Sequence, residues 1–173
     1  MGASSVTFDA FVMFRGPALL RFAFALTGDR GLAEDLVQEA LVRAYGRFSE
    51  ILVEHPEAYV RRIIVTSYLS WRRRRSSKEL PGLVPEDAVA DGTELVLQRD
   101  LVSRILAELP RRQRAVLVLR YYEGLPDSEI ADLLHCASGT VRSLAARAFA
   151  TLRSHPQLAD MGAPITLLRE EIP

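Results

Sequence analysis

The chain has little cysteine, no excess of either charge and no long apolar run. Its 173 residues include a single cysteine, Cys136, so no disulfide can form within the chain. Basic and acidic residues number 22 each and 49% of residues are hydrophobic, which excludes an intrinsically disordered chain. The longest apolar stretch, residues 18–26, is interrupted by Arg21 and is shorter than the roughly 20 residues that cross a bilayer. We therefore expect a cytoplasmic protein with no membrane insertion.

The chain also lacks the residue patterns of an enzyme. Its three histidines, His55, His135 and His155, lie far apart in the sequence and do not have metal-ligand spacing. The sequence has no glycine-rich loop of the phosphate-binding type, and Cys136 is better explained as a small packing residue than as a nucleophile. We expect no catalytic residues, no metal site and no cofactor.

The balanced total charge conceals two basic blocks separated by an acidic one. Residues 1–75 carry 11 basic and 8 acidic side chains, residues 76–100 carry 2 and 6, and residues 101–155 carry 8 and 5. Two basic blocks favour contact with nucleic acid, because phosphates attract arginine and lysine.

Apolar residues follow the helical period almost throughout, and no segment alternates convincingly as a strand. The pattern predicts a helix over residues 7–15 and a second that opens at Pro17 and ends near residue 26. A third helix is predicted over residues 31–48, with Asp29 as its N-cap. Further helices are predicted over residues 56–75, 95–109, 111–122, 127–135 and 138–153. The predicted fold is all-α.

These helices divide into two small helical domains joined by a flexible acidic linker. We place the first domain at residues 1–75, the linker at 76–94, the second domain at 95–155 and a tail of unassigned structure at 156–173. The linker contains proline, glycine and several acids without a helical period. It is long enough to let the domains pack together and inhibit the free protein. An extended free protein in small-angle scattering would refute that hypothesis.

Residues 127–153 have the pattern of a helix-turn-helix. The first helix is acidic, the turn begins at His135, and the second helix carries arginines and no acid. A recognition helix in the major groove needs this asymmetry because DNA is a dense polyanion. The candidate DNA contacts on the second helix are Thr140, Arg142, Ser143 and Arg147. The alternative is a helical hairpin whose arginines are merely solvated.

The helix predicted over residues 56–75 has no acidic residue after Glu57. Its arginines suit phosphates, and its aromatic side chains could stack on unpaired bases. The candidate nucleic-acid contacts are Tyr59, Arg61, Arg62, Thr66, Arg72, Arg73, Arg74 and Arg75. The alternative is that the aromatic residues belong to the core and that the terminal arginines complement the helix macrodipole.

The helix predicted over residues 31–48 has a charged face opposite its apolar stripe. Asp35, Gln38 and Glu39 lie on that face, which is either simply solvated or docks another protein.

Taken together, four stretches resemble the motifs of a bacterial RNA polymerase sigma factor of the extracytoplasmic-function (ECF) group of the sigma-70 family. Residues 28–40, containing AEDLVQEA, are similar to its polymerase-binding helix, and residues 56–75, beginning PEAYVRR, are similar to its −10 element helix. Residues 109–125, beginning LPRRQRAVL, resemble the start of its C-terminal domain, and GTVRS at residues 139–143 resembles its −35 recognition helix.

The resemblance implies a sigma-2-like N-terminal domain and a sigma-4-like C-terminal domain. Asp35, Gln38 and Glu39 would bind core RNA polymerase, residues 46–75 would melt the −10 element, and the helix-turn-helix would read the −35 element as duplex. The implied partners are core RNA polymerase, promoter DNA and an anti-sigma protein, and the free protein would be a monomer. The alternatives are a helix-turn-helix regulator that is not a polymerase subunit, an enzyme, or a pure interaction protein.

Four positions depart from the family pattern, among them Ala146, where a larger polar residue is frequent. Thr66 stands where asparagine is usual, and Leu144 stands where arginine is frequent, which predicts altered base choice at both promoter elements. His135 replaces the usual turn glycine and would have to adopt a positive φ at some cost.

Overall fold

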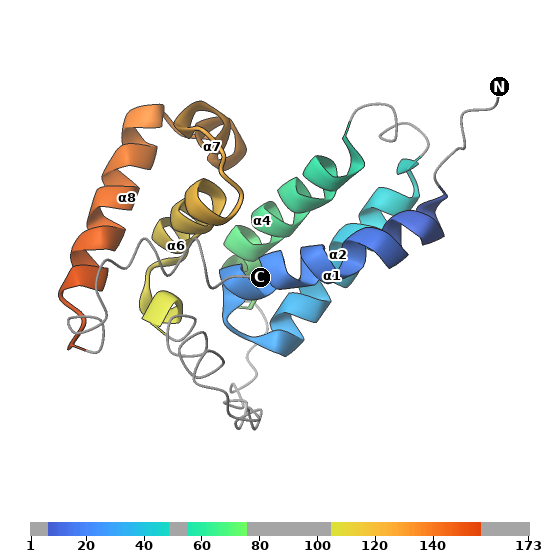
Figure 1. Ribbon diagram of the computed structural model, residues 1–173, viewed down its shortest axis with the longest axis horizontal. Helices are drawn as coiled ribbons and strands as arrows, with labels where there is room; N and C mark the ends of the chain where they lie inside the picture. Colours follow the sequence, from blue (N-terminus) through green and yellow to red (C-terminus); the bar gives the residue numbers. More distant parts are fainter. Residues whose placement is uncertain (1–6, 49–54, 76–104, 157–173) are drawn as a thin grey trace.

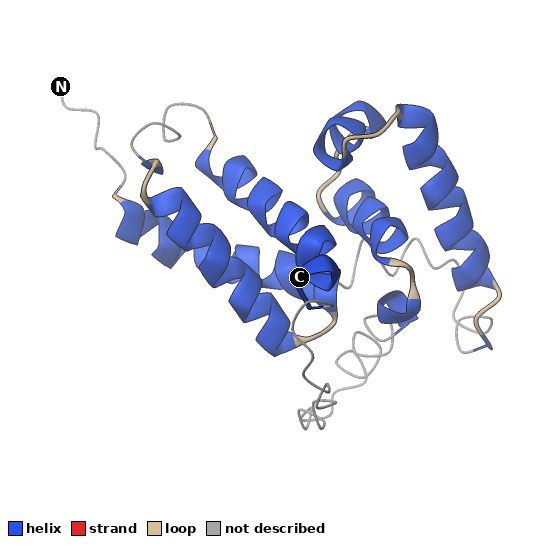
Figure 2. Cartoon of the chain, turned by 180° about the vertical axis from the view of Figure 1, so that it is seen from behind, coloured by secondary structure: helices blue, strands red, loops and turns tan. Residues whose placement is uncertain are grey.

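The computed structural model describes residues 7–48, 55–75 and 105–156, and every regular element among them is a helix (Figure 1, Figure 2). The N-terminal half contains α1 (Phe8–Thr27), α2 (Arg30–Tyr45) and α4 (Pro56–Arg75). The C-terminal half contains α6 (Arg111–Leu117), the π-helix η1 (Val118–Tyr122), α7 (Asp127–Leu134) and α8 (Ser138–Arg153), preceded by a short helical stretch at residues 105–108. The all-α prediction is confirmed. The predicted linker, most of the helix predicted over residues 95–109 and nearly all of the tail lie outside the described residues.

Helix α1 is continuous, so the predicted break at Pro17 is wrong. Thr7 caps the helix, its Oγ1 accepting a hydrogen bond from the amide of Ala10 at 3.2 Å. Proline inside a helix removes the bond to the carbonyl four residues earlier, here that of Met13. Met13 and Pro17 are both exposed, so the missing hydrogen bond falls on the solvent side of the helix. Gly16 has no Cβ to collide with the proline ring.

Helix α2 begins at Arg30, one residue before the predicted start, and its N-cap is the predicted one. The Asp29 carboxylate accepts from the amide of Leu32 at 2.7 Å, which confirms it as the N-cap. The helix buries Leu36, Val37 and Ala40 and ends at Tyr45, three residues before the predicted end.

In the N-terminal half, α1 packs on α2, and both pack on α4. The side chains of Val60 and Ile64 on α4 are buried. Val65 and Tyr68, on other sides of the same helix, are buried too. Burial on several sides occurs because α6, from the C-terminal half, also contacts α4.

Helix α1 is also the described helix that is long and apolar enough to cross a membrane by length and composition alone. The sequence pattern predicted no such segment. In this structure α1 serves as a core helix, burying Leu19, Phe22 and Leu26 against its neighbours. Core helices of soluble proteins pass the same test, so the finding is weak evidence for a membrane span.

The helix predicted over residues 111–122 changes type part-way. Val118 to Tyr122 form a π-helical turn, in which the amide of Glu123 donates to the carbonyl of Val118 at 3.1 Å. Two neighbouring tyrosines then face different partners. The Tyr121 ring meets Phe149 of α8 edge-on at 5.4 Å, whereas the Tyr122 ring stacks on Phe22 of α1 at 6.3 Å.

The helix-turn-helix is formed as the sequence predicts. Helix α8 has the predicted bounds, and α7 ends one residue early because His135 is its left-handed cap, with φ 49° and ψ 55°. The amide of Cys136 closes the turn by donating to the carbonyl of Ala131 at 2.9 Å.

The two halves share one apolar core. Phe22 and Ile64 of the N-terminal half belong to the same buried cluster as Val116, Leu119 and Ile130 of the C-terminal half. Helix α6 lies between α8 and α4 (Figure 1) and contacts both. The described parts of the two domains are therefore packed together.

Candidate polymerase and nucleic-acid interfaces

Helix α8 presents all its candidate DNA contacts to solvent. Thr140, Arg142, Ser143 and Arg147 are exposed, while the opposite side of the helix is buried against α6 and α7. The Ser143 hydroxyl donates to the carbonyl of Gly139 at 3.0 Å. Leu144, where the family often has arginine, is half-buried. The exposed face is thus basic and polar, as a groove-reading helix requires.

Helix α2 presents its charged face in the same way. Asp35 and Gln38 are exposed, and Glu39 is half-buried and paired with Arg43 at 2.6 Å between Oε1 and Nη2. Val42, which was not predicted as part of this face, is 76% exposed and continues it at the helical spacing. An exposed valine among charged residues is a signal that can be read from the sequence, because it breaks the polar face.

Helix α4 holds its candidate contacts in different environments. Arg62 is exposed, and Tyr59 is half-buried against the core. The Thr66 hydroxyl lies 3.0 Å from the carbonyls of Arg62 and Ile63, so it donates within its own helix. The side chains of Arg72, Arg73, Arg74 and Arg75 lie outside the described part of the chain.

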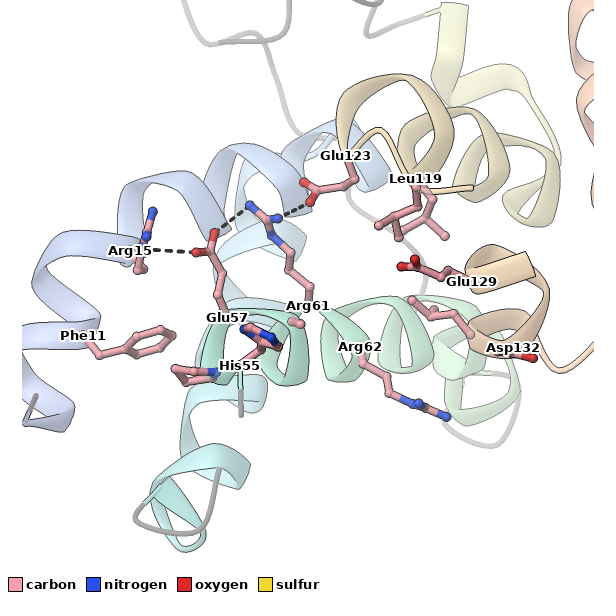
Figure 3. Close-up of a pocket in the computed structure, with 14 residues that line it drawn as sticks. Phe11, Arg15, His55, Glu57, Arg61, Arg62, Leu119, Glu123, Glu129 and Asp132 are labelled. Atoms are coloured by element: carbon pink, nitrogen blue, oxygen red, sulfur yellow. Dashed lines mark hydrogen bonds and ion pairs between the residues drawn. The ribbon is translucent and has the colours of Figure 1, made fainter. Parts of the chain in front are cut away.

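Arg61 forms an ion pair with the C-terminal half. Its guanidinium extends between Glu57 of its own helix and Glu123, which is the residue after η1 (Figure 3). The distance from Nη2 to the Glu57 carboxylate is 2.7 Å, and the guanidinium carbon lies 5.6 Å from the centre of the Phe22 ring. The Glu123 side chain is 6% exposed. Burial raises its pKa above the ordinary value, partly offset by the positive charge of Arg61.

Arg114 makes a second polar contact between the halves, and the sequence pattern predicted no role for it. This side chain is 2% exposed and caps the C-terminal end of α1. Its Nε donates to the carbonyl of Ala25 at 3.0 Å, and its Nη1 donates to that of Thr27 at 3.1 Å. Burial lowers its pKa to about 10, so it stays protonated at neutral pH. The sequence does contain a signal for the burial of Arg114. This arginine stands at the start of an apolar helical run, on the same helix face as Leu117 and Val118.

Arg111, one turn before Arg114, makes a third polar contact between the two halves. Its Nη1 donates to the carbonyl of Tyr68 at 2.8 Å, and its guanidinium carbon lies 5.0 Å from the centre of the Tyr68 ring. Arg112, its neighbour, instead donates to the carbonyl of Leu134 at 3.0 Å, within the C-terminal half.

Two family models match the chain, one on each half. The model described as Sigma-70 region 2 matches residues 12–78, and Sigma-70, region 4 matches residues 99–152. The RNA polymerase sigma-E factor of Streptomyces avermitilis is 40% identical, over 95% of this chain and 92% of its own length. The chain belongs to the ECF group of the sigma-70 family. The ECF RNA polymerase sigma factor SigL of Mycobacterium tuberculosis is 35% identical, over 72% of this chain and 75% of its own.

A solved structure shares the fold of this sigma factor. It is the sigma factor RpoE of Bartonella quintana in complex with the anti-sigma factor NepR. The TM-score is 0.66 and the identity 23%, over 90% of this chain and 98% of that one.

Membership of this family decides between the alternatives for function. A sigma factor is a non-catalytic initiation factor that acts with RNA polymerase, so the regulator outside the polymerase is disfavoured. Among residues 7–48, 55–75 and 105–156, no three histidine, cysteine or acidic side chains are grouped to hold a metal ion. Arg61, Arg111 and Arg114 of this sigma factor join its region 2 to its region 4.

Proposed function

We propose that this sigma factor docks core RNA polymerase through α2 and reads its promoter through α4 and α8. The observation that supports this proposal is that α2 and α8, which lie in different halves, each leave one polar face exposed. Asp35, Gln38 and Glu39 form the docking face, with Val42 at its edge as an apolar anchor. The α2 face is acidic, which suits a basic partner surface.

Helix α8 is proposed to bind the −35 element as duplex. Thr140, Arg142, Ser143 and Arg147 would supply the base and phosphate contacts. With Leu144 half-buried, fewer side chains reach the bases than in relatives with arginine there. We expect weaker discrimination at the corresponding base pairs.

Helix α4 and the loop before it are proposed to open the −10 element and hold its single strand. Tyr59, Arg61, Arg62 and Thr66 would contact that strand, with Arg72, Arg73, Arg74 and Arg75 on the phosphates. Extruding a base costs a few kcal/mol, which stacking and a fitted pocket can return. Thr66, in place of the usual asparagine, would change which base is accepted.

We propose that the free protein is a cytoplasmic monomer and that an anti-sigma protein is its regulatory partner. The fold shared with a sigma factor in complex with an anti-sigma factor supports that partner. The proposed organisation is a first domain at residues 1–75, a linker at 76–94, a second domain at 95–155 and a tail at 156–173.

The test is transcription by bacterial core RNA polymerase from a library of random promoters. With the sigma factor added, we expect start sites that share −35 and −10 elements. Asp35→Arg and Val42→Asp should each weaken core binding about tenfold, or about 1.4 kcal/mol. Glu129→Arg, which reverses an exposed acidic side chain on α7 in the other half, is the matched control. A folded protein that does not bind core polymerase would refute the proposal.

A further inference from the structure

Two hollows lie between the N-terminal and C-terminal halves, and their linings differ in charge. The larger, of about 750 Å³ (Figure 3), has among its lining residues the acids Glu57, Glu123, Glu129 and Asp132. The smaller, of about 460 Å³, lies between the middle of α4, helix α6 and the turn after α7, and none of its described lining residues is acidic. We call it the basic hollow, after its lining residues Arg43, Arg111, Arg112 and His135. A lining of this kind suits an anion.

Two arginines of α6 stand on different walls of the basic hollow. Nη1 of Arg111 donates to the carbonyl of Tyr68 on α4 at 2.8 Å, and Nη2 of Arg112 donates to that of Leu134 at the end of α7 at 3.0 Å. A guanidinium carries five N–H groups, and the bond to Leu134 uses one of those of Arg112. These bonds hold both side chains in place, so less side-chain freedom is lost when an anion binds between them.

The other two basic side chains come from separate elements. Arg43 of α2 is half exposed and paired with Glu39, and His135 is exposed in the turn after α7. Because Arg43 already has a carboxylate partner, Arg111 and Arg112 are the main source of positive charge. The planar fork of a guanidinium matches the oxygens of a phosphate group, which favours phosphate among anions.

The α4 wall contributes one hydroxyl whose hydrogen is not committed within the protein. Thr66 and Ser70 also line the basic hollow, but their hydroxyls donate to backbone carbonyls of α4 at 3.0 and 3.2 Å. Ser67 is 1% exposed, and its Oγ has no hydrogen-bond partner among the described residues. A buried hydroxyl without a partner is costly. A ligand oxygen that accepts from Ser67 would therefore supply a bond that the protein alone does not make.

The basic hollow also has an apolar side, formed by Leu69, Leu133 and Leu134. Its volume falls in the range of about 300–1,000 Å³ that is typical of pockets for small organic molecules, which combine apolar walls with a few polar groups. A bare phosphate ion would contact the arginines and leave the leucines uncovered. A nucleoside phosphate would use both sides, with its phosphate on the arginines and its base against the leucines.

We propose that the basic hollow binds a nucleoside phosphate, whose phosphate groups contact Arg111, Arg112 and Ser67. The bound ligand contacts both halves of the chain and stabilises the folded protein in proportion to its occupancy. The proposal does not depend on the polymerase or promoter contacts assigned to α2, α4 and α8.

Binding can be measured by calorimetry on the full chain. The probes are the mono-, di- and triphosphates of the four common ribonucleosides, with the unphosphorylated nucleosides and inorganic pyrophosphate as comparisons. We expect at least one nucleoside phosphate to bind with a stoichiometry of one and a Kd below about 1 mM, more tightly than either comparison. Weaker binding across the whole panel would overturn the proposal, and pyrophosphate binding as tightly as the best nucleotide would overturn the assignment of a nucleoside.

Two substitutions test the site itself. Arg112→Gln should weaken nucleotide binding about tenfold, because it removes a charge-assisted hydrogen bond. Arg153→Gln, which removes an exposed arginine at the end of α8, is the matched control and should leave binding unchanged. Equal affinity of wild type and a folded Arg112→Gln would overturn the proposal. If Arg112→Gln loses helical circular dichroism, Arg112→Lys, which keeps the charge and can still donate to Leu134, decides by the same criterion.

Ser67→Ala gives a readout that a purely structural serine would not give. It should raise the thermal midpoint of the ligand-free protein, because it removes an unpartnered buried hydroxyl, and weaken nucleotide binding several-fold. Unchanged nucleotide affinity in this variant would remove Ser67 from the proposed site.

A short single-stranded oligonucleotide separates a nucleotide site from a nucleic-acid site. If the oligonucleotide binds, loses affinity in Arg112→Gln and keeps it in Arg153→Gln, while no free nucleoside phosphate binds, the proposal is overturned and the basic hollow belongs to a nucleic acid strand.

Discussion

Gly28 leaves room for the side chain of Arg114 at the boundary between the two halves, because a Cβ added to Gly28 would lie 2.9 Å from Nη2 of Arg114. Gly28 also has φ 68°, the left-handed cap that ends α1, and its amide donates to the carbonyl of Phe24 at 2.7 Å. One residue thus ends a helix in region 2 and leaves room for a side chain of region 4.

Gly28→Ala should destabilise the protein more than Gly124→Ala. Both glycines have φ 68°, so both substitutions carry the backbone cost of about 1–2 kcal/mol. Only the Cβ on Gly28 meets a neighbour, since nothing lies within 4 Å of one on Gly124. Urea unfolding of the two variants measures the difference. In an Arg114→Met background the excess cost at Gly28 should shrink, and an undiminished excess would contradict the clash.

Arg61 and Glu123 should respond unequally to substitution. Burial outweighs Arg61 in setting the raised pKa of Glu123, so its charge contributes little net stability, and Glu123→Gln should change stability by less than about 1 kcal/mol. Arg61→Met leaves the carboxylates of Glu57 and Glu123 facing each other without their shared cation and should cost about 2 kcal/mol. Denaturant midpoints measure both, and equal losses would contradict this reasoning.

Acidification should favour the packed state through Glu123. A carboxyl whose pKa is raised in the packed state binds its proton more tightly there, so this contribution is fully present below the ordinary value of 4.5 and is lost as pH rises through the raised pKa. Arg61 and Glu57 are the charged groups that face it. Between neutral pH and 4.5, the wild type should gain stability relative to Glu123→Gln, measured by unfolding at each pH. A relative loss over that window would show that pairing with Arg61 outweighs burial.

His135→Gly should stabilise the helix-turn-helix by roughly 0.5–1 kcal/mol, because glycine adopts a positive φ without the strain of a Cβ. His135 is exposed, so little packing is lost. His135→Ala, which also removes the imidazole but keeps a Cβ at φ 49°, is the control and should gain no stability from this effect. Thermal unfolding followed by circular dichroism compares the two, and a lower midpoint for His135→Gly would contradict the strain argument.

What the sequence predicted well is governed by local chemistry. The bounds of α8, the Asp29 cap and the positive φ of His135 depend on side chains acting on their own segment. The break at Pro17 was predicted wrongly because the pattern does not reveal that the missing hydrogen bond falls on the solvent side. The π-helical turn at Val118 leaves no recognisable signature in residue spacing.

The polar contacts between the two halves were not predicted, and the reason is different. Arg114 bonds carbonyls 87 and 89 positions away in the sequence, so its role depends on how the two halves meet. In sequence it is one arginine among several in LPRRQRAVL. The candidate DNA-binding and polymerase-binding faces were easier to find, because an exposed face is defined by its own helix.

At the π-helical turn, two consecutive tyrosines contact different halves of the molecule. Tyr121 completes the interior of region 4 through Phe149, and Tyr122 reaches across to Phe22 of region 2. Removing one residue from Val118–Tyr122 would rotate the chain after the turn by about 100° relative to α6 before it. The ring that reaches across would then be turned inward, and Glu123 would be carried away from Arg61. A single-residue deletion would thus disturb both the packing of α8 on α6 within region 4 and the contact of region 4 with region 2.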